Sequence, residues 1–103
     1  MNILLWTDNL LTRSNLAGTW QNAGATLLKK DSGETPELIV MDLTARDAIE
    51  HIRRLRGQYP EAEILAFGPH VDGEAFRQAR AAGATSQVAR GAVVERVLAK
   101  LSA

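Results

Sequence analysis

The chain has 103 residues, of which 46% are hydrophobic and 23% charged, and its twelve basic and twelve acidic side chains cancel. This length and composition are typical of one globular domain, so we expect a single domain over residues 1–103. A net charge of zero argues against nucleic acid as the main partner, because that binding depends on a surplus of Lys and Arg.

The sequence contains no cysteine, which excludes disulfides, thiolate metal sites and cysteine nucleophiles. Its apolar runs are far shorter than the roughly 20 residues that cross a bilayer, and no basic segment precedes an apolar stretch at the N-terminus. We therefore expect a cytoplasmic protein without a membrane segment.

The first third of the chain predicts a strand, a helix and a short second strand. Residues 2–6 form an apolar run that ends in Thr7-Asp8-Asn9. A helix follows, with Asp8 or Asn9 as N-cap and Gly24 as its stop. The apolar residues that fall loosely at helical spacing are Leu10, Leu11, Leu16, Ala17, Trp20 and Ala23. Residues 25–28 are a short strand candidate.

The most informative stretch is residues 38–44, Leu-Ile-Val-Met-Asp-Leu-Thr. An unbroken apolar run of strand formers indicates a strand covered on both faces, and Asp42 stands where it ends. The turn-rich segment 31–36 leads into it without a helix. After it, Thr44 and Asp47 have the spacing of a capping box, so we expect a helix to begin at Thr44 and to stop near Gly57 and Pro60.

The last third continues the alternation of strands and helices. Residues 64–67 predict a buried strand that Gly68-Pro69-His70 breaks, and Asp72 can cap a helix that ends at Gly83. That helix would turn Phe76, Ala79 and Ala82 inward. Residues 87–89 are a weaker strand candidate. The last helix has a clear apolar face, formed by Val94, Val97, Leu98 and Leu101.

This alternation predicts an α/β fold with three layers, in which helices cover both faces of a mainly parallel sheet. Five strands favour the flavodoxin-like order 2-1-3-4-5, whose switch point lies between the first and third strands. Asp8 and Asp42 would meet there. The short 31–36 loop leaves the direction of the second strand open, and the sequence has no second helix.

Three stretches resemble the receiver domain of two-component response regulators: residues 3–8, residues 38–42, and the Gly-Ala turn and strand of residues 82–91. The resemblance implies that Asp42 is the phospho-accepting aspartate. It also implies a Mg²⁺ site formed by Asp8, Asp42 and the backbone carbonyl of Thr44. Mg²⁺ is the one cofactor that it suggests.

Other positions depart from the receiver pattern. Thr7 replaces an acidic residue, which should weaken a Mg²⁺ site, and Gly68 replaces the Thr or Ser whose hydroxyl bonds the phosphoryl group. Arg90-Gly91 replaces Lys-Pro, and Gln87 stands at the position of the switch aromatic. Because an Arg fork can clamp a carboxylate, Arg90 would hold Asp42 permanently.

Less specific roles stay open for several of these residues. Asp42 can be a strand-end carboxylate paired with Arg90, Asp8 can be a helix N-cap, and Thr44 a helix cap. His70, in a loop above the site, has no partner that supports a phosphohistidine or a general base, so a surface position is favoured. For the remaining residues we expect a solvated His51 and largely buried Trp6 and Trp20.

We therefore expect a degenerate, pseudo-receiver signalling domain that is not an enzyme and acts by protein–protein interaction, with phosphorylation lost or vestigial. The alternatives are a Mg²⁺-dependent phospho-accepting receiver of a two-component system or phosphorelay and, more remotely, a small flavodoxin-like nucleotide or flavin binder. The partner would be a sensor kinase or an effector with an acidic surface. In the family the fourth helix, fifth strand and fifth helix form the contact and dimerisation face, which here carries Arg77, Arg80, Arg96 and Lys100.

Overall fold

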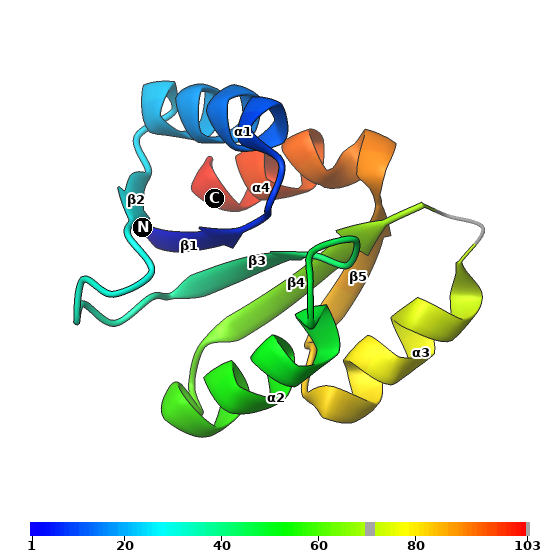
Figure 1. Ribbon diagram of the computed structural model, residues 1–103. Coiled ribbons are helices and arrows are strands. Elements are labelled where there is room, and N and C mark those ends of the chain that lie inside the picture. Colours follow the sequence, from blue (N-terminus) through cyan, green and yellow to red (C-terminus); the bar gives the residue numbers. More distant parts are fainter. Residues whose placement is uncertain (70–71, 103) are drawn as a thin grey trace.

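The computed structural model describes residues 1–69 and 72–102, so His70 lies outside the described residues. One sheet forms the middle layer, and helices cover both of its faces (Figure 1). Among the described residues, none of the helices has the length and apolar character needed to cross a membrane. The predicted three-layer α/β architecture is confirmed.

The sheet has five strands in the order β2-β1-β3-β4-β5, and every neighbouring pair is parallel. The direction of the second strand, left open by the sequence, is therefore parallel. β3 is buried at all five positions, as its apolar run predicts. The strands are β1 (Asn2–Trp6), β2 (Thr26–Leu28), β3 (Leu38–Asp42), β4 (Glu63–Gly68) and β5 (Ser86–Ala89).

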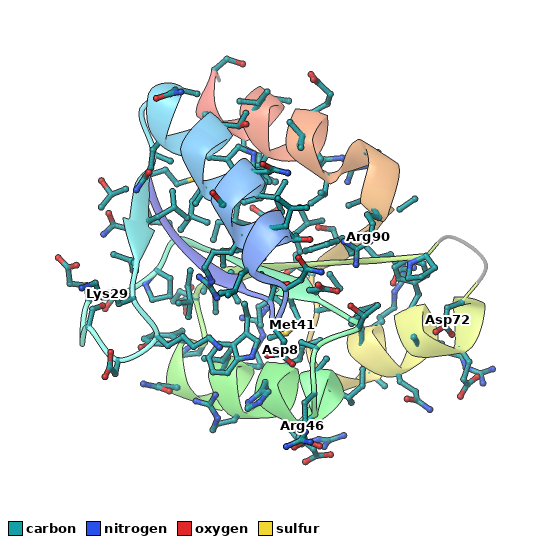
Figure 2. All side chains as sticks on the ribbon, turned by 45° about the horizontal axis from the view of Figure 1, so that its top comes forward. Asp8, Lys29, Met41, Arg46, Asp72 and Arg90 are labelled. Carbon is teal, nitrogen blue, oxygen red and sulfur yellow. The ribbon has the colours of Figure 1, made fainter. Side chains whose placement is uncertain are left out.

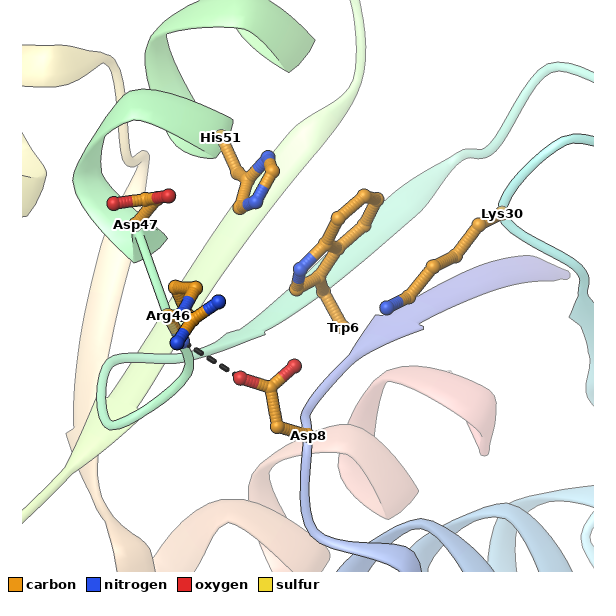
Figure 3. A pocket seen from close by; sticks show the side chains of 6 residues that line it. All are labelled: Trp6, Asp8, Lys30, Arg46, Asp47 and His51. Carbon is orange, nitrogen blue, oxygen red and sulfur yellow. Dashed lines mark hydrogen bonds between the residues drawn. The ribbon is translucent and has the colours of Figure 1, made fainter.

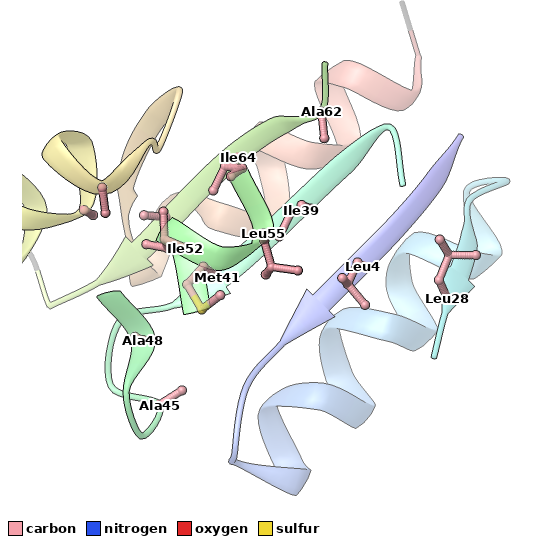
Figure 4. Close-up of a cluster of buried hydrophobic side chains, with 13 residues drawn as sticks. Leu4, Leu28, Ile39, Met41, Ala45, Ala48, Ile52, Leu55, Ala62 and Ile64 are labelled. Atoms are coloured by element: carbon pink, nitrogen blue, oxygen red, sulfur yellow. The ribbon is translucent and has the colours of Figure 1, made fainter. Parts of the chain in front are cut away.

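The helices form two pairs, one on each face of the sheet. On one face lie α1 (Leu10–Asn22) and α4 (Val93–Leu101), and on the other α2 (Ala48–Gln58) and α3 (Gly73–Ala82). Alternate strand residues feed two separate cores, because neighbouring side chains of a strand point to opposite faces. Figure 4 shows the α2 and α3 core, in which Ile52 and Leu55 of α2 pack with Ile39 and Met41 of β3. Trp20 of α1 is fully buried in the other core.

Two predicted helix caps are present in the structure. The side chain of Asn9 accepts a hydrogen bond from the Thr12 N–H at the start of α1, and Asp72 accepts one from Ala75 at the start of α3. Each satisfies an N–H that has no partner within its helix. α3 ends at Gly83, whose φ of 128° lies in the region that favours glycine.

The predicted capping box at the start of α2 is wrong. The helix begins at Ala48, and its N-cap is Asp47, which has a φ of 56° and makes no side-chain capping bond. The Thr44 hydroxyl donates instead to the Asp42 carboxylate, at 2.7 Å. This bond to an ionised acceptor turns the Thr44 side chain toward Asp42, and the left-handed Asp47 delays the helix to Ala48.

Leu10 and Leu11, which the sequence places in the apolar pattern of the first helix, are exposed by 80% and 72%. Leu16 and Trp20 supply the buried face of α1. Leu10 and Leu11 therefore lie on the solvent-facing side of the first turn of α1.

No helix occurs in residues 29–37, which connect β2 to β3, as predicted. The connection returns to the sheet at Glu37, whose N–H donates to the carbonyl oxygen of Asn2, at 2.9 Å. On the way, the Lys30 ammonium lies 4.1 Å from the ring centroid of Trp6. Lys30 therefore covers part of the sheet face that a second helix would cover.

At the amino ends of β4 and β5, Arg56 of α2 links several segments. Its guanidinium donates to the carbonyl oxygens of Gly83, Tyr59, Pro60 and Ala62 and to the Thr85 hydroxyl, at 2.7–3.4 Å. The Arg56 side chain also lies so close to Gly83 that an added Cβ there would be 2.8 Å from its Cγ. We call this arrangement the Arg56 cluster.

Candidate functional site

The predicted site residues gather where the parallel strands end. Asp8 follows β1, Asp42 ends β3, Gly68 ends β4 and Arg90 follows β5. In an open parallel sheet the carboxyl ends of the strands share one edge, and ligands bind there near the switch in strand order. The topology thus brings these four positions to the same end of the sheet.

The Asp42 carboxylate is buried, with 1% of its side chain exposed, and both of its oxygens accept hydrogen bonds from the protein. Oδ2 accepts from the Thr7 hydroxyl at 2.7 Å. Oδ1 accepts from the Thr44 N–H at 2.9 Å, the Thr44 hydroxyl at 2.7 Å and Nη2 of Arg90 at 3.3 Å. Oδ1 thus accepts three of the four bonds and Oδ2 one, so the protein engages both oxygens but bonds Oδ1 more fully than Oδ2.

Arg90 is the only cation in an ion pair with Asp42 among the described residues. Its side chain is 44% exposed, and its guanidinium carbon lies 5.3 Å from the centroid of the Phe67 ring. A second contact joins Nη2 to the Thr44 hydroxyl at 3.5 Å. The predicted contact between Arg90 and Asp42 is therefore present, but it is a single contact and not a two-pronged clamp.

Thr7 has a role that the sequence interpretation missed. Its side chain is buried, its hydroxyl donates to Asp42, and the same hydroxyl oxygen accepts a bond from the Asn9 N–H at 3.2 Å. Thr7 in place of an acidic residue thus not only removes one carboxylate but also supplies a hydrogen-bond donor to another, that of Asp42. A hydroxyl residue at the end of one strand, beside a carboxylate at the end of its neighbour, is the sequence signal that could have found it.

Asp8 takes no part in the hydrogen bonds found around Asp42 among the described residues. Its Oδ2 accepts a hydrogen bond from the Arg46 backbone N–H at 2.7 Å (Figure 3). Asp8 lines a surface hollow of about 450 Å³ that Asp42 does not line, and the other lining residues are Trp6, Lys30, Arg46, Asp47 and His51.

The wall of this hollow is an aromatic pair, the half-buried Trp6 and His51, with ring centroids 4.4 Å apart. His51 was expected to be solvated, but it packs on the indole, and Nη2 of Arg54 lies 3.1 Å from its Nδ1. Arg46 lies on the α2 side of the sheet, whereas Arg90 lies on the α4 side (Figure 2). The two arginines therefore belong to different surroundings.

Gly68 and Gln87, two positions at which the sequence departs from the receiver pattern, also differ from that pattern in their side-chain size. A Cβ added at Gly68 would lie 3.3 Å from the Cβ of Leu43, so a larger residue there requires Leu43 to move. Gln87 lies on β5 and lines a hollow of about 280 Å³ with Phe76, Arg77 and Arg80 of α3. Gln87 thus contributes a polar side chain to this hollow, at the position where the receiver pattern has an aromatic ring.

The four cations of the expected interaction face do not share one environment. Arg77 pairs with Glu74, and Lys100 pairs with Glu63. Arg80 and Arg96 are exposed, on α3 and α4 respectively. Two of the four charges therefore have a local counter-charge, and Arg80 and Arg96, for which no ion pair is found within residues 1–69 and 72–102, are the positions more available to a partner.

The residues present fit Mg²⁺ poorly. Mg²⁺ requires near-octahedral oxygen coordination and binds mainly through carboxylates. Asp42, however, faces two hydroxyls, an N–H and a guanidinium, and Asp8 is bound to Arg46. No group of three or more His, Cys, Asp or Glu side chains that could hold a metal occurs within residues 1–69 and 72–102.

The chain is similar in sequence to a curated transcriptional activator. The transcriptional activator protein ExaE of Pseudomonas putida is 33% identical to it over 111 aligned residues, which cover 95% of this chain and 52% of that protein. The chain thus spans about half the length of this curated relative. No family model matches the chain.

Solved structures similar to the chain are response regulators. One, from Burkholderia pseudomallei, contains a phosphorylated aspartic acid, a calcium ion and citrate; it is 28% identical, with a TM-score of 0.83 over 97% of this chain and 65% of that one. The chemotaxis protein CheY4 of Vibrio cholerae is 21% identical, with a TM-score of 0.81 over 98% and 95% of the two chains. A receiver domain from Clostridium thermocellum is 12% identical, with a TM-score of 0.82 over 98% and 90%. The fold is that of response regulator receiver domains.

Proposed function

We propose that the chain is a receiver-type signal-transduction domain of the two-component class that works by binding another protein, is not an enzyme, and no longer accepts a phosphoryl group on Asp42. The observation that carries this proposal is the hydrogen bonding of the Asp42 carboxylate, which is 1% exposed and satisfied by Thr7, Thr44 and Arg90. Function would then depend on the shape of the domain and not on its phosphorylation.

Phosphoryl transfer needs an attacking oxygen that can approach the phosphorus in line, and cations that neutralise the charge of the phosphoryl group. Oδ1 would have to give up hydrogen bonds before it could attack, and Oδ2, which accepts only the bond from Thr7, belongs to a side chain that is 1% exposed and therefore hard for a phosphodonor to reach. Arg90 could supply positive charge, but it already contacts the nucleophile. Each of these bonds lowers the reactivity of the carboxylate in the ground state.

The response of a receiver to phosphorylation would also be impaired. Gly68 has no hydroxyl to bond a phosphoryl oxygen, and Leu43 occupies the space beside it. Gln87 lacks the ring that changes position in the receiver pattern. A modified Asp42 would therefore have neither the hydroxyl nor the aromatic ring through which a receiver alters the surface of α3 and β5.

The partner that we propose is a protein with an acidic surface, which would contact Arg80 and Arg96. Arg80 lies beside the hollow that Gln87 and Phe76 line, where a side chain of the partner could enter. A sensor kinase remains the alternative partner under this proposal.

A second candidate function is that of a Mg²⁺-dependent phospho-acceptor. It is supported by the 28%-identical response regulator that carries a phosphorylated aspartic acid. Asp8, Asp42 and Thr44 also stand at the positions that the receiver pattern requires. Under this reading the bonds around Asp42 open when Mg²⁺ and a phosphodonor arrive.

Incubation with acetyl phosphate and Mg²⁺, followed by intact-mass measurement, separates the two candidates. We expect no phosphoryl adduct on the wild-type chain, under conditions in which a receiver with an intact acidic site is modified. An adduct that is absent from the Asp42→Asn variant would establish phosphoryl acceptance by Asp42 and overturn the proposal. An adduct that persists in that variant would report a different acceptor.

A further inference from the structure

The solvent-facing side of α1 differs from that of every other α-helix in the protein. None of its exposed residues is charged: Leu10, Leu11, Ser14, Asn15, Thr19, Gln21 and Asn22. Charged residues account for three of five exposed residues on α2, three of six on α3 and two of three on α4. An α-helix that faces water normally carries its charged residues on that side.

The single charged residue of α1 is not on this surface. Arg13 is half-buried, and its Nη2 donates to the backbone carbonyl of Thr7 at 3.2 Å. Leu10 and Leu11, exposed by 80% and 72%, are two of the three large hydrophobic side chains that stand exposed among the described residues. Two adjacent exposed leucines on an uncharged helix face indicate a surface that is covered in the working form of the protein.

The size of the side chains changes along this face. Leu11, Ser14 and Gly18 follow at intervals of three and four residues, so they lie on one side of the helix. The large residues are in the first turn, and Gly18 is in the third. A Cβ added at Gly18 would meet nothing within 4 Å, so open space lies beside it.

We infer that α1 is a dimer interface, in which it packs antiparallel against α1 of a second copy of this chain. A two-fold axis near Ser14 and Asn15 brings Leu11 of each copy over Gly18 of the other, two helical turns and about 10 Å along the axis. Leu11 of each helix then packs against Gly18 of the other, and the same contact occurs on both sides of the axis, as an isologous interface requires. This contact is distinct from the α3, β5 and α4 surface that the receiver resemblance suggests.

The absence of charge favours a second copy over a different protein as the occupant. Across a two-fold axis each residue faces residues of the same surface, so a face with charges of one sign would place like charges together. α1 avoids this, because its exposed residues are all uncharged. It also offers no charge by which an unlike partner could be selected, although such complementarity commonly sets partner choice.

The available area sets the expected strength of the dimer. A helix of 13 residues is about 20 Å long. Its face alone is smaller than the roughly 800 Å² per partner of a standard stable interface, so we expect a dissociation constant on the order of 100 µM. Self-association should therefore be reversible and visible only in concentrated solution.

Sedimentation equilibrium of the whole chain tests the inference. We expect the average mass of the wild type to rise toward twice 11.2 kDa as the concentration increases. Leu11→Glu, at an exposed position, should fold normally by circular dichroism yet remain monomeric. Ala81→Glu adds the same charge at an exposed position of α3 and should dimerise like the wild type. A wild type that stays monomeric up to about 1 mM would overturn the inference.

A cysteine variant tests the antiparallel geometry. The chain has no cysteine, so a single introduced thiol can form a disulfide only with its copy in another molecule. Ser14→Cys, near the proposed axis, should form a disulfide-linked dimer under mild oxidation, at least tenfold faster than Ala81→Cys. Equal rates for the two variants would contradict the proposed interface. So would a dimer in which Leu11→Glu is as tightly associated as the wild type.

Discussion

Two arginines hold opposite ends of the same sheet, and they do so differently. Arg56 donates to four backbone carbonyls and a hydroxyl at the amino ends of β4 and β5. Arg90, at the carboxyl ends, makes one contact of 3.3 Å with the Asp42 carboxylate and one of 3.5 Å with Thr44, and 44% of its side chain is exposed. One guanidinium is saturated by the protein, and the other is not.

The difference separates a structural role from a role in the site. Four of the five acceptors of Arg56 are backbone carbonyls in the segments that follow α2 and α3, which any sequence with this fold also contains, and the fifth is the Thr85 hydroxyl. Arg90 instead pairs with a side-chain carboxylate that is particular to this sequence, that of Asp42. Loss of Arg56 should therefore affect the stability of the domain, and loss of Arg90 should affect mainly the properties of Asp42.

The largest effect is expected for Arg56→Ala. The substitution leaves several partly buried carbonyls without a donor, and we expect a loss of about 3 kcal/mol in the free energy of unfolding. Urea denaturation followed by circular dichroism measures it. Arg53→Ala, which removes a solvent-exposed ion pair with Glu50 on the same helix, should change stability by less than about 0.5 kcal/mol. Equal losses for the two variants would show that the Arg56 cluster is not structural.

A smaller loss is expected for Thr7→Val. Valine matches the shape of threonine but removes the buried hydroxyl that donates to Asp42. A hydrogen bond to a charged acceptor contributes more than a neutral one, so we expect a loss of about 2 kcal/mol. Thr12→Val, at a half-buried position of α1 whose hydroxyl takes part in no hydrogen bond found among the described residues, is the matched control. A Thr7→Val variant as stable as the wild type would show that the hydrogen bond from Thr7 to Asp42 does not contribute to stability.

The smallest of the three effects is expected for Arg90→Met. Methionine keeps much of the contact with Phe67 but removes the ion pair, and Asp42 retains its bonds from Thr7 and Thr44. Because Arg90 is well exposed, we expect a loss of only about 1 kcal/mol, again by urea denaturation. A loss as large as that of Arg56→Ala would mean that both arginines are structural.

The fold could be predicted from the sequence because its signals are local. The buried strand 38–42, the caps Asn9 and Asp72 and the stop at Gly83 each follow from a few neighbouring residues. The strand order then followed from topology, and the absence of a helix in residues 29–37 from the turn-forming composition of that segment.

The candidate site was only partly predictable, because its contacts join residues distant in sequence. Thr7 and Asp42 are 35 positions apart, and a pattern cannot show which way a hydroxyl turns. The capping box failed because spacing alone cannot show that the helix begins only at Ala48, or that the Thr44 hydroxyl turns toward the Asp42 carboxylate. The Arg56 cluster had no sequence signal, because its acceptors are backbone carbonyls that every residue possesses.

The most direct test of a permanently bonded Asp42 compares the wild type with the variant Thr7→Asp, Gly68→Ser, Arg90→Lys, both treated with acetyl phosphate and Mg²⁺ and analysed by intact mass. The variant restores the acid, the hydroxyl and the mobile ammonium of the receiver pattern. We predict no phosphoryl adduct on the wild type and an adduct on the variant that Asp42→Asn abolishes. A wild type modified on Asp42 as fully as the variant would contradict the account.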